Sequence, residues 1–183
     1  VRLMKPMPEL DKMLERANAA GIFGTKMRST IEAASPTGIA SNVAQQFGIA
    51  KIILGHGLVP IVEPEVSILI ADKAEAEDIL RDEIVNQLDK LDADQEVMLK
   101  LTLPETANHY IPLIEHPRVM RVVALSGGYT RAEANARLAK NAGLVGSFSR
   151  ALTEGLSVEQ SDEAFIRALE DSIESIHRAS MAG

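Results

Sequence analysis

Lys100 lies within an apolar stretch of the sequence, Val97-Met98-Leu99-Lys100-Leu101, where an ammonium group has no obvious partner. Burial among apolar side chains disfavours the charged form of an amine, and a neutral amine can attack a carbonyl carbon. One interpretation of Lys100 is therefore a lysine that forms a Schiff base with a carbonyl substrate. The alternative is a lysine at the end of a strand whose ammonium group extends to solvent along its aliphatic stem.

Polar or charged side chains also occur at four other points where a strand-like apolar run ends. They are Lys26 and Arg28, Glu63 and Glu65, Ser126 with Gly127 and Gly128, and Ser149 with Arg150. Paired glycines leave backbone N–H groups free to approach an anion, and a guanidinium group suits bidentate contact with phosphate. Each group alone has an ordinary explanation as a solvated strand edge, a tight turn or a surface ion pair. Together they predict carbonyl chemistry on a phosphorylated substrate.

The elements that must position these residues alternate between short apolar runs and longer amphipathic runs. Strands are expected over residues 22–28, 58–66, 97–103, 119–126 and 144–149. Helices are expected between and after them, including one over 106–115. Capping boxes are expected at Asp72 with Glu75, Thr130 with Glu133, and Ser157 with Gln160. This alternation predicts an α/β fold with a parallel sheet, in a single domain that spans residues 1–183.

The period of the apolar residues does not distinguish an open doubly wound sheet from a (β/α) barrel. The chemistry at the strand ends favours the barrel. In that fold, catalytic side chains from the carboxyl ends of several strands project into one common site.

The overall composition restricts the classes of partner. The chain has 183 residues, of which 46% are hydrophobic and 25% charged, and its formal charge of −7 argues against nucleic acid as the main partner. No apolar stretch approaches the roughly 20 residues of a membrane span, and no secretory signal is evident at Val1. Cysteine is absent from the sequence, which fits a reducing compartment. We therefore expect a cytoplasmic protein without membrane partners.

Metal binding is not indicated either. His109, Glu115 and His116 lie close together in the sequence, but no third and fourth ligand follows them at a useful spacing.

Six segments resemble, in order, the strand-end motifs of class I fructose-1,6-bisphosphate aldolase, and closely those of its short bacterial type. The segments are Leu3-Met4-Lys5-Pro6, Phe23-Gly24-Thr25-Lys26-Met27-Arg28-Ser29, Gly57-Leu58-Val59-Pro60-Ile61-Val62-Glu63-Pro64-Glu65, Met98-Leu99-Lys100-Leu101-Thr102, Leu125-Ser126-Gly127-Gly128-Tyr129 and Ser147-Phe148-Ser149-Arg150-Ala151-Leu152. Any one of them is a weak signal, but the ordered series is specific and runs along the whole chain. The resemblance implies a (β/α)8 TIM barrel. It also implies a glycolytic and gluconeogenic lyase that cleaves fructose 1,6-bisphosphate reversibly into dihydroxyacetone phosphate and glyceraldehyde 3-phosphate, through an imine and without a metal or another cofactor.

The same resemblance implies roles for individual residues. Lys100 matches the Schiff-base lysine. Glu63 matches the acid/base residue that serves carbinolamine dehydration and removes the hydroxyl proton that starts cleavage. Lys26 matches a second active-site lysine, and Glu65 is a nearby carboxylate that could hold Lys26 in place.

Binding of the two substrate phosphates is implied at the remaining positions. Ser126, Gly127, Ser149 and Arg150 match one phosphate site, with Gly128 beside them in the same turn. Arg28 is the best candidate near the other phosphate.

The sequence departs from the family at its front. The first three strands of the family's barrel contribute an aspartate and a further lysine, and nothing before Val1 supplies them. The length is also below the roughly 250 residues of a typical barrel. We therefore expect an incomplete barrel of about five parallel strands with flanking helices, which corresponds to the carboxyl-terminal portion of such an aldolase. The activity of the chain alone is in doubt, and its exposed strand edges favour association, for example into a homo-oligomer.

Two other functions stay open from the sequence. Another Schiff-base sugar-phosphate lyase or a transaldolase would keep the barrel and the imine but act on a different substrate, although two phosphate-type sites favour the bisphosphate. An inactive fragment or a non-catalytic binding protein could retain the fold without turnover.

Overall fold

The computed structural model describes residues 2–183. Strands and helices alternate along the chain, as the apolar runs predict. The elements are α1 (Leu10–Ala19), β1 (Gly24–Ile31), α2 (Pro36–Gly55), β2 (Val59–Val66), α3 (Lys73–Leu88), β3 (Val97–Thr102), α4 (Ile111–Ile114), β4 (Val119–Leu125), α5 (Arg131–Leu138), β5 (Val145–Gly146), α6 (Arg150–Thr153) and α7 (Asp162–Met181).

The five strands form one parallel sheet in the order β1-β2-β3-β4-β5, so that each strand pairs with the next one along the chain. The sheet is open, because no strand within residues 2–183 joins β5 back to β1. Sequential parallel strands with helical crossovers are the arrangement of a (β/α)8 barrel. The prediction of an incomplete barrel is therefore confirmed.

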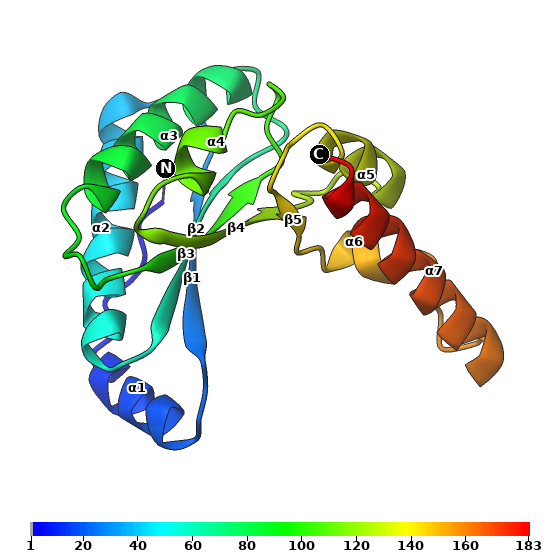
Figure 1. Ribbon diagram of the computed structural model, residues 1–183, viewed down its shortest axis with the longest axis horizontal. Coiled ribbons are helices and arrows are strands. Elements are labelled where there is room, and N and C mark those ends of the chain that lie inside the picture. The colour runs from blue at the N-terminus through cyan, green and yellow to red at the C-terminus, as the bar shows by residue number, and fades with distance from the viewer. Residues whose placement is uncertain (1) are drawn as a thin grey trace.

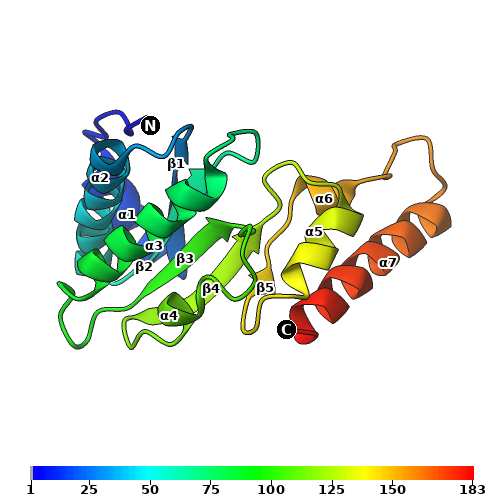
Figure 2. The same cartoon turned by 90° about the horizontal axis from the view of Figure 1, so that it is seen from above.

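Different helices pack against the two ends of this sheet. Helices α1 to α4 lie on one side of strands β1 to β4, while α5, α6 and α7 pack around the short strand β5 (Figures 1 and 2). Most strand side chains on the helix side of the sheet are apolar and buried, and they form the core together with the apolar faces of α2 and α3. The strand residues of this set are Met27, Ile31, Val62, Val66, Leu99, Leu101, Val122 and Ala124.

Several boundaries follow from local sequence. Ser35 caps the start of α2, because its hydroxyl accepts a hydrogen bond from the Gly38 N–H. Pro36 follows in the first turn of the helix. The Thr130 hydroxyl accepts from the Glu133 N–H at 3.2 Å and begins α5, as the predicted capping box requires. A Cβ on Gly24 would lie 2.2 Å from the Val59 carbonyl oxygen. A residue larger than glycine at this position would therefore force β1 and β2 apart.

Two of the expected capping interactions were wrong, although α3 does begin directly after Asp72. The Asp72 carboxylate accepts from the Ala34 N–H at 2.7 Å and does not cap α3. Helix α7 is capped by Ser161, four residues after the expected Ser157.

Three expected element lengths were also wrong. The helix expected over 106–115 is reduced to α4, because Asn108 adopts a positive φ of 61°. Strand β1 extends to Ile31, beyond the expected end at residue 28, and β5 pairs with β4 only at Val145 and Gly146.

No helix within the described residues combines the length and the apolar character that a membrane crossing requires.

Candidate active site

Five charged candidates, all from strands β1 to β3, lie on the face of the sheet opposite the core helices. Side chains alternate along a strand, so Lys26 and Arg28 of β1 share one face, as do Glu63 and Glu65 of β2. The parallel register places Arg28 beside Glu63, and Lys100 of β3 has buried apolar neighbours on both sides that face the core. These five candidates therefore lie within the strands, facing the open side of the sheet, whereas the other five follow β4 and β5.

Lys100 and Glu63 are in contact. The Lys100 Nζ lies 3.5 Å from the Glu63 Oε1, and the exposed fractions of the two side chains are 18% and 4%. The backbone N–H of Glu63 donates to the Oε1 of Gln46, a fully buried residue of α2, at 3.0 Å. Helix α2 thus fixes the strand position from which the carboxylate reaches the lysine.

Lys26 approaches the same carboxylate from the other side. Its Nζ donates to the Glu63 Oε2, and its side chain is 41% exposed. The Glu63 carboxylate therefore bridges two amino groups, one on each neighbouring strand. Such a bridge fixes the orientation of the carboxylate while leaving Oε1 directed at Lys100.

Glu65 does not hold Lys26, contrary to the role expected from the sequence. It accepts a hydrogen bond from the Arg28 Nε at 2.7 Å. In the register, Lys26 lies beside Ile61, four residues from Glu65, which is about 13 Å along a strand. The Glu65 carboxylate, through this hydrogen bond, raises the pKa of the Arg28 guanidinium above its ordinary value.

The turn after β4 contains Ser126, Gly127 and Gly128. Both glycines have positive φ, 64° and 121°, and the turn is closed by a hydrogen bond from the Tyr129 N–H to the Ser126 carbonyl at 3.0 Å. A Cβ on Gly127 would lie 2.7 Å from the Cγ2 of Ile68, so the turn packs closely on the loop after β2. Glycine is therefore required at Gly127 by both conformation and space.

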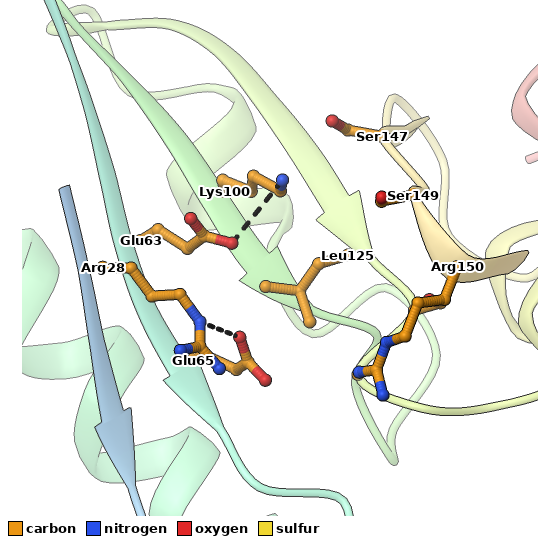
Figure 3. A pocket seen from close by; sticks show the side chains of 10 residues that line it. Arg28, Glu63, Glu65, Lys100, Leu125, Ser147, Ser149 and Arg150 are labelled. Atoms are coloured by element: carbon orange, nitrogen blue, oxygen red, sulfur yellow. Dashed lines mark hydrogen bonds and ion pairs between the residues drawn. The ribbon is translucent and has the colours of Figure 1, made fainter. Parts of the chain in front are cut away.

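These groups border one cleft of about 410 Å³ on the open face of the sheet. Figure 3 shows Arg28, Glu63 and Glu65 on one side, the 147–150 segment on the other, and Lys100 and Leu125 between them. The lining residues are Arg28, Glu63, Glu65, Lys100, Leu125, Ser126, Gly127, Ser147, Ser149 and Arg150. Eight of the ten predicted site residues line it. Lys26 contacts it through Glu63, and a Cβ on Gly128 would lie 3.9 Å from the Arg150 guanidinium.

Sequence reasoning did not single out three residues of this region. Leu125 and Ser147 line the cleft, and Gln46 supports Glu63 from the helix layer. Alternation from Ser149 would have indicated Ser147, since positions two apart share a face of an extended segment. Nothing in the sequence indicates Gln46, because a glutamine in an apolar helix has no distinguishing pattern.

No group of three or more His, Asp or Glu side chains that could hold a metal ion occurs in the part of the chain that the structure describes.

Comparison with known proteins gives close relatives. No protein-family profile matches the chain. The sequence is 55% identical over 180 residues to a class 1 fructose-bisphosphate aldolase of Synechocystis sp., and this match covers 98% of the chain and 60% of the relative. A class 1 fructose-bisphosphate aldolase of Porphyromonas gingivalis is also 55% identical, over 181 residues, with 99% of the chain and 61% of the relative covered. The chain thus spans about 60% of the length of these relatives.

The fold has a solved counterpart. A fructose-bisphosphate aldolase from Plasmodium falciparum, crystallised with TRAP and a small-molecule inhibitor, superposes with a TM-score of 0.64 at 21% identity. The superposition covers 95% of this chain and 60% of that protein. The resemblance to class I fructose-bisphosphate aldolase that the motifs predict is confirmed by these relatives.

Proposed function

We propose that the chain, whose relatives are class 1 fructose-bisphosphate aldolases, forms the carboxyl-terminal portion of such a lyase and carries its Schiff-base lysine. The observation that supports this function is the contact of 3.5 Å between the Lys100 amine and the buried Glu63 carboxylate. The contact lies in a cleft with an arginine on each side. The substrate would be fructose 1,6-bisphosphate, and the products would be dihydroxyacetone phosphate and glyceraldehyde 3-phosphate.

In the first stage, the Lys100 ammonium would give a proton to Glu63, 3.5 Å away, and the neutral amine would then attack the substrate ketone to form a carbinolamine. Loss of water then gives an iminium ion, and the departing hydroxyl needs a proton. Glu63 is the carboxyl group within reach of the Lys100 nitrogen, so it would deliver that proton as a general acid. Lys26 holds the other oxygen of the same carboxylate and keeps it oriented.

In the second stage, a base removes the proton of the hydroxyl on the carbon that becomes the aldehyde. The carbon–carbon bond breaks, and its electron pair moves into the iminium to give an enamine. Glu63 is ionised after the dehydration step, so the same carboxylate would accept this proton. Protonation of the enamine and hydrolysis of the imine then release the ketone product and restore Lys100.

The two ends of the cleft would bind the two phosphates. At one end, the Gly127 backbone, Ser126, Ser149 and Arg150 offer N–H, hydroxyl and guanidinium donors. Gly128 belongs to the same turn. At the other end, Arg28 is the donor, and Glu65 holds it. The separation of two cationic ends by Lys100 suits a substrate that is phosphorylated at both termini.

The names of the relatives favour this reaction over a transaldolase or a non-catalytic binding protein. A cytoplasmic location and self-association through the open edges of β1 and β5 belong to the same proposal. Because the relatives are longer, we expect the 183-residue chain to form the imine but to complete turnover more slowly than they do.

Reduction of the imine tests the proposal. The chain is incubated with dihydroxyacetone phosphate, reduced with borohydride and digested, and the labelled lysine is identified by mass spectrometry. We expect label on Lys100 and none after Lys100→Arg. The matched control is Lys140→Arg, an exposed lysine just after α5, which should retain full labelling. Label on another lysine, or no label on the unaltered chain, would contradict the proposed function.

A further inference from the structure

A second group of polar and charged side chains lies outside the cleft, next to the Ser126-Gly127-Gly128 turn, which we call the glycine turn. It consists of Lys73 and Glu77 from α3, Glu105 from the loop after β3, Tyr129 from the glycine turn and Arg137 from α5, and we refer to it as the Glu105 cluster. Lys73 and Glu77 are 3% and 1% exposed, whereas Glu105 lies at the surface. None of these residues lines the cleft.

The buried part of the cluster fixes the chain just after β3. The Lys73 Nζ donates to the Glu77 Oε1 at 2.5 Å and to the Leu103 carbonyl at 2.9 Å, and it lies 3.1 Å from the Glu105 Oε1. The Glu105 N–H donates to the second oxygen of Glu77 at 3.0 Å. Glu105 is therefore held at two points. Lys73 contacts its carboxylate, and Glu77 accepts a hydrogen bond from its backbone N–H.

Tyr129 connects this fixed point to the glycine turn. Its hydroxyl donates to the Glu105 Oε1 at 3.1 Å, while its backbone N–H closes the turn at the Ser126 carbonyl. The Arg137 guanidinium lies 4.2 Å above the Tyr129 ring and 3.2 Å from the Glu105 Oε2. Tyr129 is thus held at its ring, its hydroxyl and its backbone.

We propose that Tyr129, held by Glu105, positions the Ser126-Gly127-Gly128 turn to bind an anionic phosphate group of the substrate. Glycines allow this turn its positive φ angles but also leave it conformationally free. An anchor on the next residue limits that freedom before the ligand arrives, which lowers the cost of ordering the turn on binding. Tyr129 is therefore a positioning residue that contacts no substrate, and the identity of the anion rests on the proposed function.

The charge state of the cluster is compatible with this anchor. Burial opposes ionisation of Glu105, but the hydrogen bond and charge of Lys73, together with Arg137, lower the pKa of its carboxyl below the usual value. Glu105 stays an acceptor for the Tyr129 hydroxyl at neutral pH. Burial, and next the Glu105 charge, raise the pKa of Tyr129 to about 12, so the hydroxyl keeps its proton to donate.

The first test is titration of the 183-residue chain with inorganic phosphate, followed by NMR at the Gly127 and Gly128 amides. We expect Tyr129→Phe to weaken phosphate binding by about threefold to tenfold, which is less than the full effect of a hydrogen bond to a charged group because the lost bond anchors the turn and does not contact the phosphate. Glu105→Gln should weaken binding in the same direction. The matched control is Tyr110→Phe, because the buried Tyr110 hydroxyl has no hydrogen-bond partner among residues 2–183, and this variant should bind phosphate as the unaltered chain does.

The second test compares borohydride labelling of Lys100 by dihydroxyacetone phosphate and by dihydroxyacetone, which lacks the phosphate. Tyr129→Phe should raise the half-saturating concentration of the phosphorylated ketone by the same factor. The limiting labelling rate and the labelling by dihydroxyacetone should not change. A residue with a merely structural role would alter labelling by both ketones.

The outcomes separate this proposal from the proposed function. Unchanged phosphate affinity in Tyr129→Phe, with or without a loss of thermal stability, would overturn the positioning role. So would an unaltered chain whose Gly127 and Gly128 amides do not respond to phosphate. If Tyr129→Phe weakens phosphate binding but neither ketone labels Lys100, the positioning role stands and the aldolase function fails.

Discussion

Two lysines, Lys100 of β3 and Lys73 of α3, differ in how many oxygen atoms their amino groups contact. Lys73 lies beneath the end of β3, almost fully buried, and its Nζ contacts three oxygens, those of Glu77, Leu103 and Glu105. Lys100 lies on the open face, and within residues 2–183 its Nζ has one ion-pair partner, at 3.5 Å. The more deeply buried lysine is the one whose donors are all in use.

This difference shows that burial alone does not identify a reactive amine. The three donors of an ammonium group are matched by three acceptors at Lys73, so attack on a carbonyl would require breaking that arrangement. At Lys100, one acceptor leaves room for a substrate carbon in the cleft. An amine that is partly buried, sparsely bonded and adjacent to a cleft is the better candidate nucleophile.

The largest effect is expected from removing Lys73. Lys73→Met leaves Glu77 buried without its partner and should lower the free energy of unfolding by about 3–5 kcal/mol. Lys100→Met should cost less than about 1 kcal/mol, because Glu63 keeps its ion pair with Lys26. Urea unfolding followed by circular dichroism measures both.

A double variant tests the cause of that loss. Lys73→Met combined with Glu77→Met removes both buried charges and should recover much of the stability. If Lys73→Met lowered the free energy of unfolding as little as Lys100→Met, the proposed contrast between the two lysines would be wrong.

The next largest effect concerns the partner of Lys100. Glu63→Gln removes the proposed proton donor and should slow formation of the trapped imine by about 10²-fold. Glu65→Gln changes a carboxylate that contacts Arg28 and not Lys100, so its effect on the same rate should be far smaller. Single-turnover borohydride trapping measures both rates, and equal losses would remove the special role of Glu63.

A smaller effect is expected at the turn between the two lysine environments. Gly127→Ala combines a positive φ, which costs roughly 1–2 kcal/mol, with a close approach to Ile68 at 2.7 Å. Gly155→Ala is the matched control, because its φ of 84° is also positive but no contact within 4 Å of the added carbon comes from the part of the chain that the structure describes. Urea unfolding should show a larger loss for Gly127→Ala. Equal losses would mean that packing on Ile68 contributes nothing.

The smallest effect is spectroscopic and concerns the Glu105 cluster. Burial, followed by the Glu105 charge, raises the pKa of Tyr129 from 10.0 to about 12, and burial raises the pKa of Tyr110 well above 10.0. The folded chain should therefore show no phenolate absorbance step at the ordinary pKa, whereas the denatured chain should. The stabilisation from Tyr129 is present below its unfolded pKa and is lost as the pH rises through about 12. Glu105→Gln should lower the pKa of Tyr129, and an unchanged value would contradict the contact.

The sequence predicts the sheet and most of the site because both depend on local patterns. Alternating apolar runs determine the five strands, and two-residue spacing places Lys26 with Arg28 and Glu63 with Glu65 on one face. The partners of these residues depend on the register between β1 and β2, which no local pattern specifies. The assignment of Glu65 to Lys26 was wrong for that reason.

Sequence patterns also did not indicate the buried polar contacts. Lys73 begins an amphipathic helix and resembles a solvated residue in the sequence, and Gln46 resembles an ordinary helix residue. Both are buried because segments distant in sequence cover them, among them the loop after β3 for Lys73. Only the assembled fold brings Leu103 to Lys73 and Glu63 to Gln46.

The ion pair between Arg28 and Glu65 has a consequence for how strongly each end of the cleft holds a ligand. A phosphate that approaches Arg28 competes with a carboxylate tethered to the neighbouring strand, at 2.7 Å from the guanidinium. Its apparent association constant equals the intrinsic value multiplied by the fraction of time for which the tethered carboxylate is displaced. Glu65 thus acts as an internal competitor at this end, so that under the proposed function a product whose phosphate binds at Arg28 would be held less tightly there than Arg28 alone would hold it.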